Sequence, residues 1–130
     1  MGFRMTDEVF TRGLALRRHM FGPAGAEQQV EAATDFTRPL QEWVTRQCFG
    51  EAWHRPALDR RTRSMMTLSM LIALGREQEI KVHVRGAIAN GVNKDEIREL
   101  MMHSIIYCGV PLAVGAFRAA VEVLKELGLE

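Results

Sequence analysis

Three side chains of different chemistry share one face of a predicted helix. Arg76, Glu79 and His83 follow one another at spacings of three and four residues, which are neighbouring positions on an α-helix. A cation, a carboxylate and an imidazole held together can bind an anion and transfer a proton. An apolar stripe beside them, which includes Ile80 and Val84, indicates that this face lies next to a core. The spacing therefore indicates an acid–base group on a rigid support.

The same spacing has two other interpretations. Glu79 and His83, four residues apart, are also typical of an ordinary ion pair on a helix surface. They could bind a metal ion, but a metal site needs further ligands, and His19, His54 and His103 show no diagnostic spacing to them. We predict no metal here, and the ion pair remains an alternative.

Length and composition limit the class of protein. A chain of 130 residues fits a single domain, over residues 1–130, that needs no metal or disulfide for stability. Its 17 basic residues nearly balance 16 acidic ones, so no overall charge favours nucleic acid or an anionic membrane. No apolar run reaches the roughly 18 residues that span a bilayer. Two cysteines outside any paired motif, Cys48 and Cys108, point to a reducing compartment, and we expect a cytoplasmic protein.

Helix signals recur along the whole sequence, and no segment alternates as a strand would. We predict an all-α fold with helices over about residues 7–20, 27–33, 35–50, 59–75, 76–91, 93–109 and 111–127. Thr6, Asp59 and Asn93 are the expected N-caps. Residues 51–58 form an irregular loop around Pro56. Tight turns between paired helices predict antiparallel neighbours.

Further polar and aromatic side chains are candidates for a ligand site. Arg63 lies in the first turn of helix 59–75, where backbone N–H groups also favour an anion, and Ser64 adds a hydroxyl. The structural alternative for Arg63 is an internal ion pair with Glu79 or another acid. Trp53 either lines a pocket or pins the irregular loop, and Tyr107 is either a packed ring or a catalytic group.

Several short segments form a recognisable combination: Trp53-x-Arg55-Pro56, Asp59-x-x-Thr62-Arg63-Ser64, Arg76-Glu77-x-Glu79, His83-Val84-Arg85 and Tyr107-Cys108-Gly109-Val110-Pro111. Together they resemble the carboxymuconolactone decarboxylase family, from about residue 13 to residue 127. The resemblance implies an alkylhydroperoxidase D-like bundle of about six to seven helices. It also implies an oligomer, a homo-trimer or homo-hexamer with active sites near subunit contacts.

The resemblance implies cofactor-free decarboxylation of a small carboxylated lactone. The reaction is that of 4-carboxymuconolactone to 3-oxoadipate enol-lactone, in protocatechuate degradation. His83 is then the expected proton donor, titrating near neutrality, and Glu79 orients it or shuttles protons. The expected substrate-binding residues are Arg63, Arg76, Ser64, Trp53 and Tyr107.

Two details of the sequence refine the resemblance. Redox relatives carry Cys-x-x-Cys where this chain has Arg76 and Glu79, so a dithiol peroxidase is excluded. Family members commonly continue Pro111 with Ala-Ala-Asn, whereas this chain has Leu112, Ala113 and Val114. A paralogous enzyme acting on another small lactone or cyclic carboxylate is therefore the first alternative. A non-catalytic oligomeric binding protein, with methionine-rich helices at subunit contacts, is the second.

Overall fold

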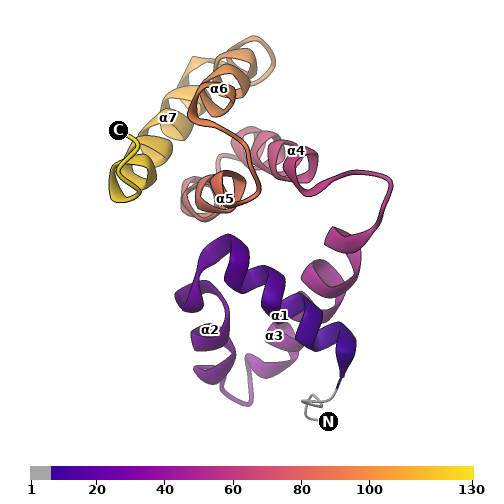
Figure 1. Ribbon diagram of the computed structural model, residues 1–130. Coiled ribbons are helices and arrows are strands. Elements are labelled where there is room, and N and C mark those ends of the chain that lie inside the picture. The colour runs from indigo at the N-terminus through magenta and orange to yellow at the C-terminus, as the bar shows by residue number, and fades with distance from the viewer. Residues whose placement is uncertain (1–6) are drawn as a thin grey trace. The chain divides into compact units, whose positions relative to one another are not determined.

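The computed structural model describes residues 7–130. Within that range the chain forms seven α-helices, one π-helix and two 3-10 turns, with no strand, so the predicted all-α class is confirmed. The chain divides into two compact units, residues 1–58 and 59–130 (Figure 1). Each unit has a buried apolar cluster of its own. The single domain that we expected from chain length stays a prediction.

The first unit consists of short helical segments. It contains α1 (Glu8–Phe21), the 3-10 turn η1 (Pro23–Gly25), α2 (Glu27–Glu31), α3 (Arg38–Trp43), the π-helix η2 (Val44–Glu51) and the 3-10 turn η3 (Ala52–His54). Because α3 runs directly into η2, the helix that we predicted over residues 35–50 is α-helical only in its first half. The wider π-helical turn is not visible in an apolar pattern that predicts simply a helix.

Two glycines allow the backbones of α1 and η2 to touch. A Cβ atom at Gly13 would lie 1.9 Å from the carbonyl oxygen of Thr45, and one at Gly50 would lie 2.5 Å from that of Val9. Arg12 closes the contact, since its Nε donates to the carbonyl oxygen of Gly50 at 2.8 Å. A side chain at either glycine would push the two helices apart.

The cap of α1 differs from the prediction. The carboxylate of Asp7 accepts hydrogen bonds from the backbone N–H groups of Val9 at 3.0 Å and Phe10 at 3.3 Å. Thr6, the predicted cap, lies outside the described residues. Aspartate combines a capping oxygen with a negative charge at the positive end of the helix. Either residue satisfies the sequence rule, so the rule did not separate them.

The second unit has four helices around one core. They are α4 (Arg60–Leu74), α5 (Glu77–Ala89), α6 (Lys94–Cys108) and α7 (Val110–Glu126). The predicted caps of α4 and α6 are confirmed: Asp59 accepts from the N–H of Thr62 at 2.7 Å, and Asn93 forms a capping box with Glu96. The core includes buried apolar residues of all four helices, among them Leu68, Ile72, Ile80, Val84, Ile97, Met101, Ala116 and Val123.

Ion pairs show how the four helices run. Three pairs join α5 to α7 in the same order along both helices: Glu77–Arg118, Lys81–Glu122 and Arg85–Glu126. These two helices are therefore parallel neighbours, although the turns reverse the chain between α4 and α5 and between α6 and α7. A pair between Arg61 and Glu96 joins the starts of α4 and α6. One end of the unit thus contains the end of α4, the start of α5, the end of α6 and the start of α7. Arg76 lies there, and we call it the Arg76 end.

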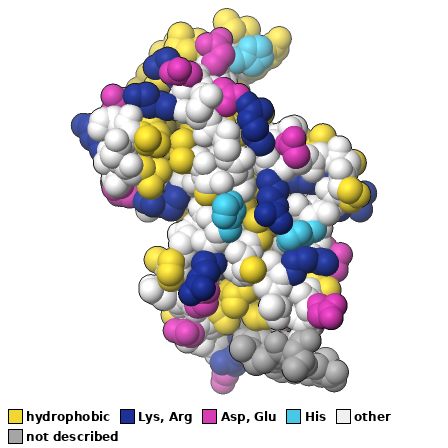
Figure 2. All heavy atoms as spheres, in the orientation of Figure 1, with side chains coloured by type: hydrophobic (Ala, Val, Ile, Leu, Met, Phe, Trp, Pro, Cys, Tyr) yellow, Lys and Arg dark blue, Asp and Glu magenta, His cyan; other side chains and the backbone are white. Residues whose placement is uncertain are grey.

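Charge is mixed on the face of the protein seen in Figure 2. Figure 2 shows basic and acidic side chains interspersed on the face in view, as the nearly balanced composition suggests. Among residues 7–130, no helix is long and apolar enough to cross a membrane.

Candidate active site

Arg76 lies in the tight turn between α4 and α5, directly before the start of α5. Gly75 follows α4 in the left-handed conformation, with φ 69° and ψ 32°, which glycine adopts without strain. The N–H groups of Gly75 and Arg76 each bond at 3.0 Å to a carbonyl of the last turn of α4, those of Ile72 and Leu71. Arg76 then occupies the N-cap position of α5. The predicted trio therefore starts on a backbone that is hydrogen-bonded on both sides.

Arg76 and Glu79 form an ion pair at the surface. Nε of Arg76 donates to Oε1 of Glu79 at 2.7 Å, and Nη2 contacts the same oxygen. The Arg76 side chain is 63% exposed and that of Glu79 is 38% exposed. Exposed pairs of this kind contribute about 0–1 kcal/mol, so a competing anion can displace the carboxylate at little cost.

His83 lies one turn further along α5 and is largely buried. Burial lowers the pKa of its imidazole from 6.5 to about 4, and the Glu79 carboxylate opposes part of this fall. The imidazole is therefore neutral at pH 7 in the free protein, whereas the sequence led us to expect titration near neutrality. Desolvation is the reason, and residue spacing does not reveal it.

The trio has no third metal ligand within the described chain. No group of three His, Cys, Asp or Glu side chains comes together among residues 7–130. A zinc site would need at least three such ligands around the ion.

Ser64 lies at the other end of α5 from Arg76. It is fully buried, and its hydroxyl accepts a hydrogen bond at 3.0 Å from Nδ2 of Asn90, which follows the last turn of α5. Arg76 and Asn90 are about 21 Å apart along the helix axis, at the usual rise per residue. Arg63 is half-buried and precedes Ser64 on α4. The structure does not bring Ser64 to Arg76; it gives this hydroxyl a bond that joins α4 to α5.

The two aromatic candidates lie in different surroundings. The ring of Trp53 stacks on Phe49 in the first unit, with centroids 5.9 Å apart, and Phe49 meets Phe21 edge-on at 5.5 Å. Trp53 therefore has a packing role in that cluster. Tyr107 is 78% exposed at the Arg76 end, and its ring lies 5.2 Å from that of His103.

Leu112 is a neighbour of the trio that the sequence did not identify as a site residue. A Cβ atom at Gly75 would lie 3.2 Å from Cδ2 of Leu112, so this side chain packs against the turn before Arg76. The only signal in the sequence was the departure from the family pattern after Pro111. Val114, the second departure, is half exposed one turn further into α7.

Large apolar side chains are exposed at the Arg76 end. Each of them is at least 50% exposed, and they form what we call the apolar end patch: Met70, Leu74, Ile106, Tyr107, Val110 and Val114. Exposed apolar surface of this kind marks a contact with another protein or a ligand.

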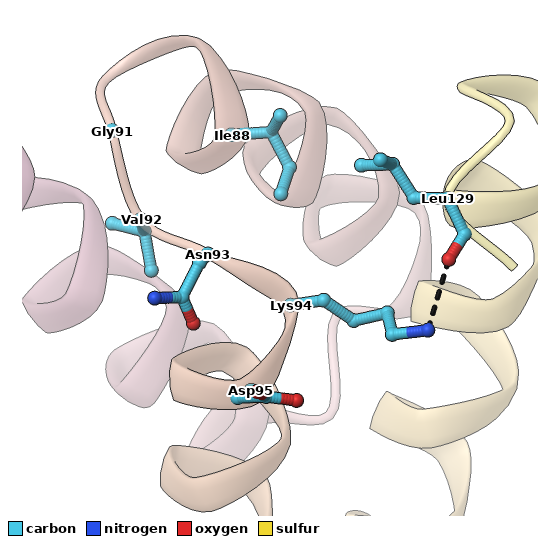
Figure 3. A pocket seen from close by; sticks show the side chains of 7 residues that line it. All are labelled: Ile88, Gly91, Val92, Asn93, Lys94, Asp95 and Leu129. Carbon is cyan, nitrogen blue, oxygen red and sulfur yellow. Dashed lines mark hydrogen bonds between the residues drawn. The ribbon is translucent and has the colours of Figure 1, made fainter.

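A surface hollow lies at the opposite end of the second unit. Its volume is about 510 Å³, and Figure 3 shows the residues that line it: Ile88, Gly91, Val92, Asn93, Lys94, Asp95 and Leu129. Nζ of Lys94 donates to the carbonyl oxygen of Leu129 at 2.9 Å across it. None of the predicted site residues lines this hollow, so the trio does not belong to it.

The fold is an all-α helical bundle. The sequence model of the carboxymuconolactone decarboxylase family matches residues 38–122, a range that includes Arg76, Glu79 and His83. The chain belongs to this family.

Similar proteins include two decarboxylases. The 4-carboxymuconolactone decarboxylase of Acinetobacter baylyi is 40% identical over 126 residues, which cover 96% of this chain and 94% of that protein. The nitrosuccinic acid decarboxylase of Metarhizium robertsii is 38% identical over 119 residues, covering 92% and 83%. An uncharacterised 15.0 kDa protein of Paracoccus denitrificans is 27% identical over 125 residues, covering 95% and 92%. The chain is a carboxy-lyase, and the non-catalytic interpretation is set aside.

Proposed function

We propose that the protein decarboxylates 4-carboxymuconolactone to 3-oxoadipate enol-lactone, a step of protocatechuate degradation. The observation that carries this proposal is the 40% identity to the Acinetobacter enzyme over 96% of the chain. The trio at the start of α5 supplies groups that such a reaction needs, a cation for a carboxylate and a titratable imidazole.

The chemistry requires an acid and a stabilised oxyanion. The bond from the γ-carbon to its carboxylate breaks, CO2 leaves, and the electron pair moves through the conjugated C=C bond into the lactone carbonyl. The resulting dienolate takes one proton at the α-carbon, so no oxidant or reductant is consumed. Positioned donors near the oxyanion lower the barrier, and a positioned acid delivers the proton.

Each member of the trio has a role in this reaction. Arg76, exposed at the helix start, binds a substrate carboxylate or the lactone oxyanion. His83 is the proton donor once it is charged, and a substrate carboxylate nearby favours that charge. The carboxylate that departs is the one gripped least, because tight binding of it in the ground state would oppose the reaction.

A second substrate class is supported by one specific observation. Leu112, a bulky apolar side chain, packs against Gly75 in the turn before Arg76. The 38% identical relative is named for nitrosuccinic acid, a smaller and acyclic dicarboxylate. A nitro group can accept the electron pair of the broken bond as a lactone carbonyl does. The alternative is therefore decarboxylation of another small polycarboxylate by the same trio.

CO2 release from two compounds separates these proposals. Purified protein is supplied with 4-carboxymuconolactone or nitrosuccinate, without added metal or thiol. We expect the higher kcat/KM on the lactone. Turnover of nitrosuccinate alone would select the second substrate class. If the protein has helical circular dichroism and a cooperative unfolding transition but releases CO2 from neither compound, both proposals fail.

We further propose that the protein is a homo-trimer or homo-hexamer whose copies bury the apolar end patch. Six large apolar side chains exposed beside an active-site helix support this assembly. Light scattering should give the mass of a trimer or hexamer, and Ile106→Glu should lower it. Val82→Glu, at an exposed apolar position outside the patch, is the matched control. A monomeric wild-type protein would contradict the assembly.

A cytoplasmic location is also part of this proposal. Cys48 and Cys108 are both free thiols in the structure. Free thiols persist in a reducing compartment and are typically oxidised outside it. Fractionation of the native host cells would test the location directly, and recovery of the protein outside the cytoplasm would contradict it.

A further inference from the structure

The Glu79 carboxylate has two neighbours of different kinds on α5. On one side is Arg76, which donates to Oε1 of Glu79 at 2.7 Å from an exposed position. On the other is His83, whose imidazole is largely buried and senses the charge of Glu79. Spacings of three and four residues place both neighbours within reach of one glutamate side chain. One carboxylate thus lies between an exposed cation and a largely buried titratable ring.

The charged groups on the elements packed against α5 are those of α7 and of the first turn of α4. On α7, Arg118, Glu122 and Glu126 pair with residues 77, 81 and 85, which lie two positions from 79 and 83 and so on nearly the opposite side of α5. Lys125 is exposed on the last turn of α7. On α4, the charged residues Arg60, Arg61 and Arg63 all lie in the first turn, level with the end of α5, and Arg61 pairs with Glu96. The charge that acts on His83 is that of Glu79.

We infer that Arg76 restrains the Glu79 carboxylate in the free protein, and that a substrate carboxylate bound by Arg76 releases Glu79 to act on His83. This inference rests on the proposed function, since it assigns to the substrate's own carboxylate the task of charging the acid. The exchange replaces one carboxylate by another on the same guanidinium, so its cost is small. The imidazole then takes a proton from solvent and holds it beside the substrate.

The exchange predicts that substrate binding precedes the protonation of His83. Without substrate, the largely buried imidazole of His83 is almost entirely neutral at pH 7. With substrate on Arg76, the released carboxylate favours the imidazolium, because an opposite charge within about 4–6 Å raises the pKa of an imidazole by about one or more. A carboxylate on the guanidinium therefore increases the charged fraction of the His83 imidazole.

Nuclear magnetic resonance titration of the His83 imidazole tests this exchange without any turnover. Wild type, Arg76→Gln, Glu79→Gln and the matched control Arg98→Gln are titrated as full-length proteins, with and without succinate. Arg98 forms an equivalent pair with Asp95, three residues away on α6, so its loss controls for the loss of a surface arginine. Succinate carries two carboxylates and lacks the electron sink that decarboxylation needs.

In wild type and Arg98→Gln, we expect succinate to raise the pKa of His83 from about 4 to above about 5. In Arg76→Gln the pKa should already be raised without succinate, and succinate should not change it. In Glu79→Gln it should stay low in both conditions. An unliganded Arg76→Gln curve that coincides with wild type, or an equal succinate effect in Glu79→Gln, would overturn the inference. Failure to decarboxylate the lactone would overturn only the proposed function, because this titration needs no turnover.

Discussion

The starts of α5 and α6 carry the same kind of polar pair in different surroundings. In both, an arginine donates at 2.7 Å to a carboxylate three residues away, Arg76 to Glu79 and Arg98 to Asp95. At α6 the side chain of Asn93 caps the helix in a capping box with Glu96, so the local hydrogen bonds are complete. At α5 no side chain caps the helix. The N-terminus of α6 is thus capped by side chains of its own first turn, whereas the N-terminus of α5 has no side-chain cap.

The second difference is what lies one turn further along. His83 follows Glu79 by four residues and is largely buried, with its pKa lowered to about 4. Glu99 follows Asp95 by four residues and is exposed. An ion pair at this spacing is common on helices and contributes little. A buried titratable ring beside it is what distinguishes a candidate site from a surface pair.

The largest expected effect is the loss of the buried imidazole. His83→Gln should lower kcat on the lactone by about a hundredfold or more, because general acid catalysis contributes about 10²–10⁴. His103→Gln, an exposed histidine of α6, is the matched control and should stay within about twofold of wild type. Initial rates of CO2 release measure both. Equal losses of kcat in the two variants would contradict a specific catalytic role for His83 on α5.

Acid stability should reveal the same imidazole. The folded protein favours neutral His83, so between pH 6.5 and about 4 the unfolded chain binds more protons, and stability falls as the pH falls through this window. The fall in pKa from 6.5 to about 4 corresponds to about 3 kcal/mol at most. Urea unfolding at several pH values should give a steeper loss for wild type than for His83→Gln. Asp59, whose pKa is lowered by hydrogen bonds from Thr62, loses its contribution to stability only at pH values below its usual pKa of 3.8. Parallel curves for the two proteins would contradict the burial of a neutral imidazole.

Loss of the guanidinium should have a smaller effect. Arg76→Gln should raise KM by about tenfold and change kcat less, since a charge-assisted hydrogen bond to a carboxylate contributes about 1.5–3 kcal/mol. Arg98→Gln removes the equivalent arginine of α6 and should leave both constants within about twofold. Steady-state kinetics on the lactone provide the comparison. A KM unchanged in Arg76→Gln would show that the substrate carboxylate binds elsewhere.

The smallest effect belongs to the start of α6. Asn93→Ala removes the helix cap and should lower the free energy of unfolding by about 1 kcal/mol. Activity at temperatures well below unfolding should stay within about twofold, because the cap lies at the far end of the unit from Arg76. Thermal unfolding and rate measurements on the same preparation test both parts. A large loss of activity with unchanged stability would assign chemistry to α6 instead.

Local features of the fold were predictable from sequence. The caps at Asp59 and Asn93 and the glycine after α4 act within one turn of the chain, so the rules for helix ends identified them. The π-helix η2 was not predicted. It lies in close contact with α1 through Gly13 and Gly50, residues 37 positions apart, and sequence rules for local structure do not include such contacts.

The candidate site also has features that were predictable from local sequence and features that depend on tertiary packing. The grouping of Arg76, Glu79 and His83 was predictable because helical spacing alone produces it. The neutral state of His83 depends on burial by residues distant in sequence, and the bond between Ser64 and Asn90 depends on how α4 packs against α5. Spacing determines which groups share a face, and tertiary packing determines their charge and their partners.

The stereochemistry of protonation at the α-carbon tests most directly whether His83 is the proton donor. Wild-type protein is supplied with 4-carboxymuconolactone in D2O, and the enol-lactone is analysed at early times by deuterium nuclear magnetic resonance in a chiral liquid crystal, which separates the two enantiomers at the deuterated α-carbon. A positioned acid delivers deuterium to one face of the α-carbon, so we predict a single stereoisomer carrying one deuterium for each CO2 released. Equal amounts of both stereoisomers, formed at the rate of CO2 release, would mean that solvent rather than His83 protonates the dienolate.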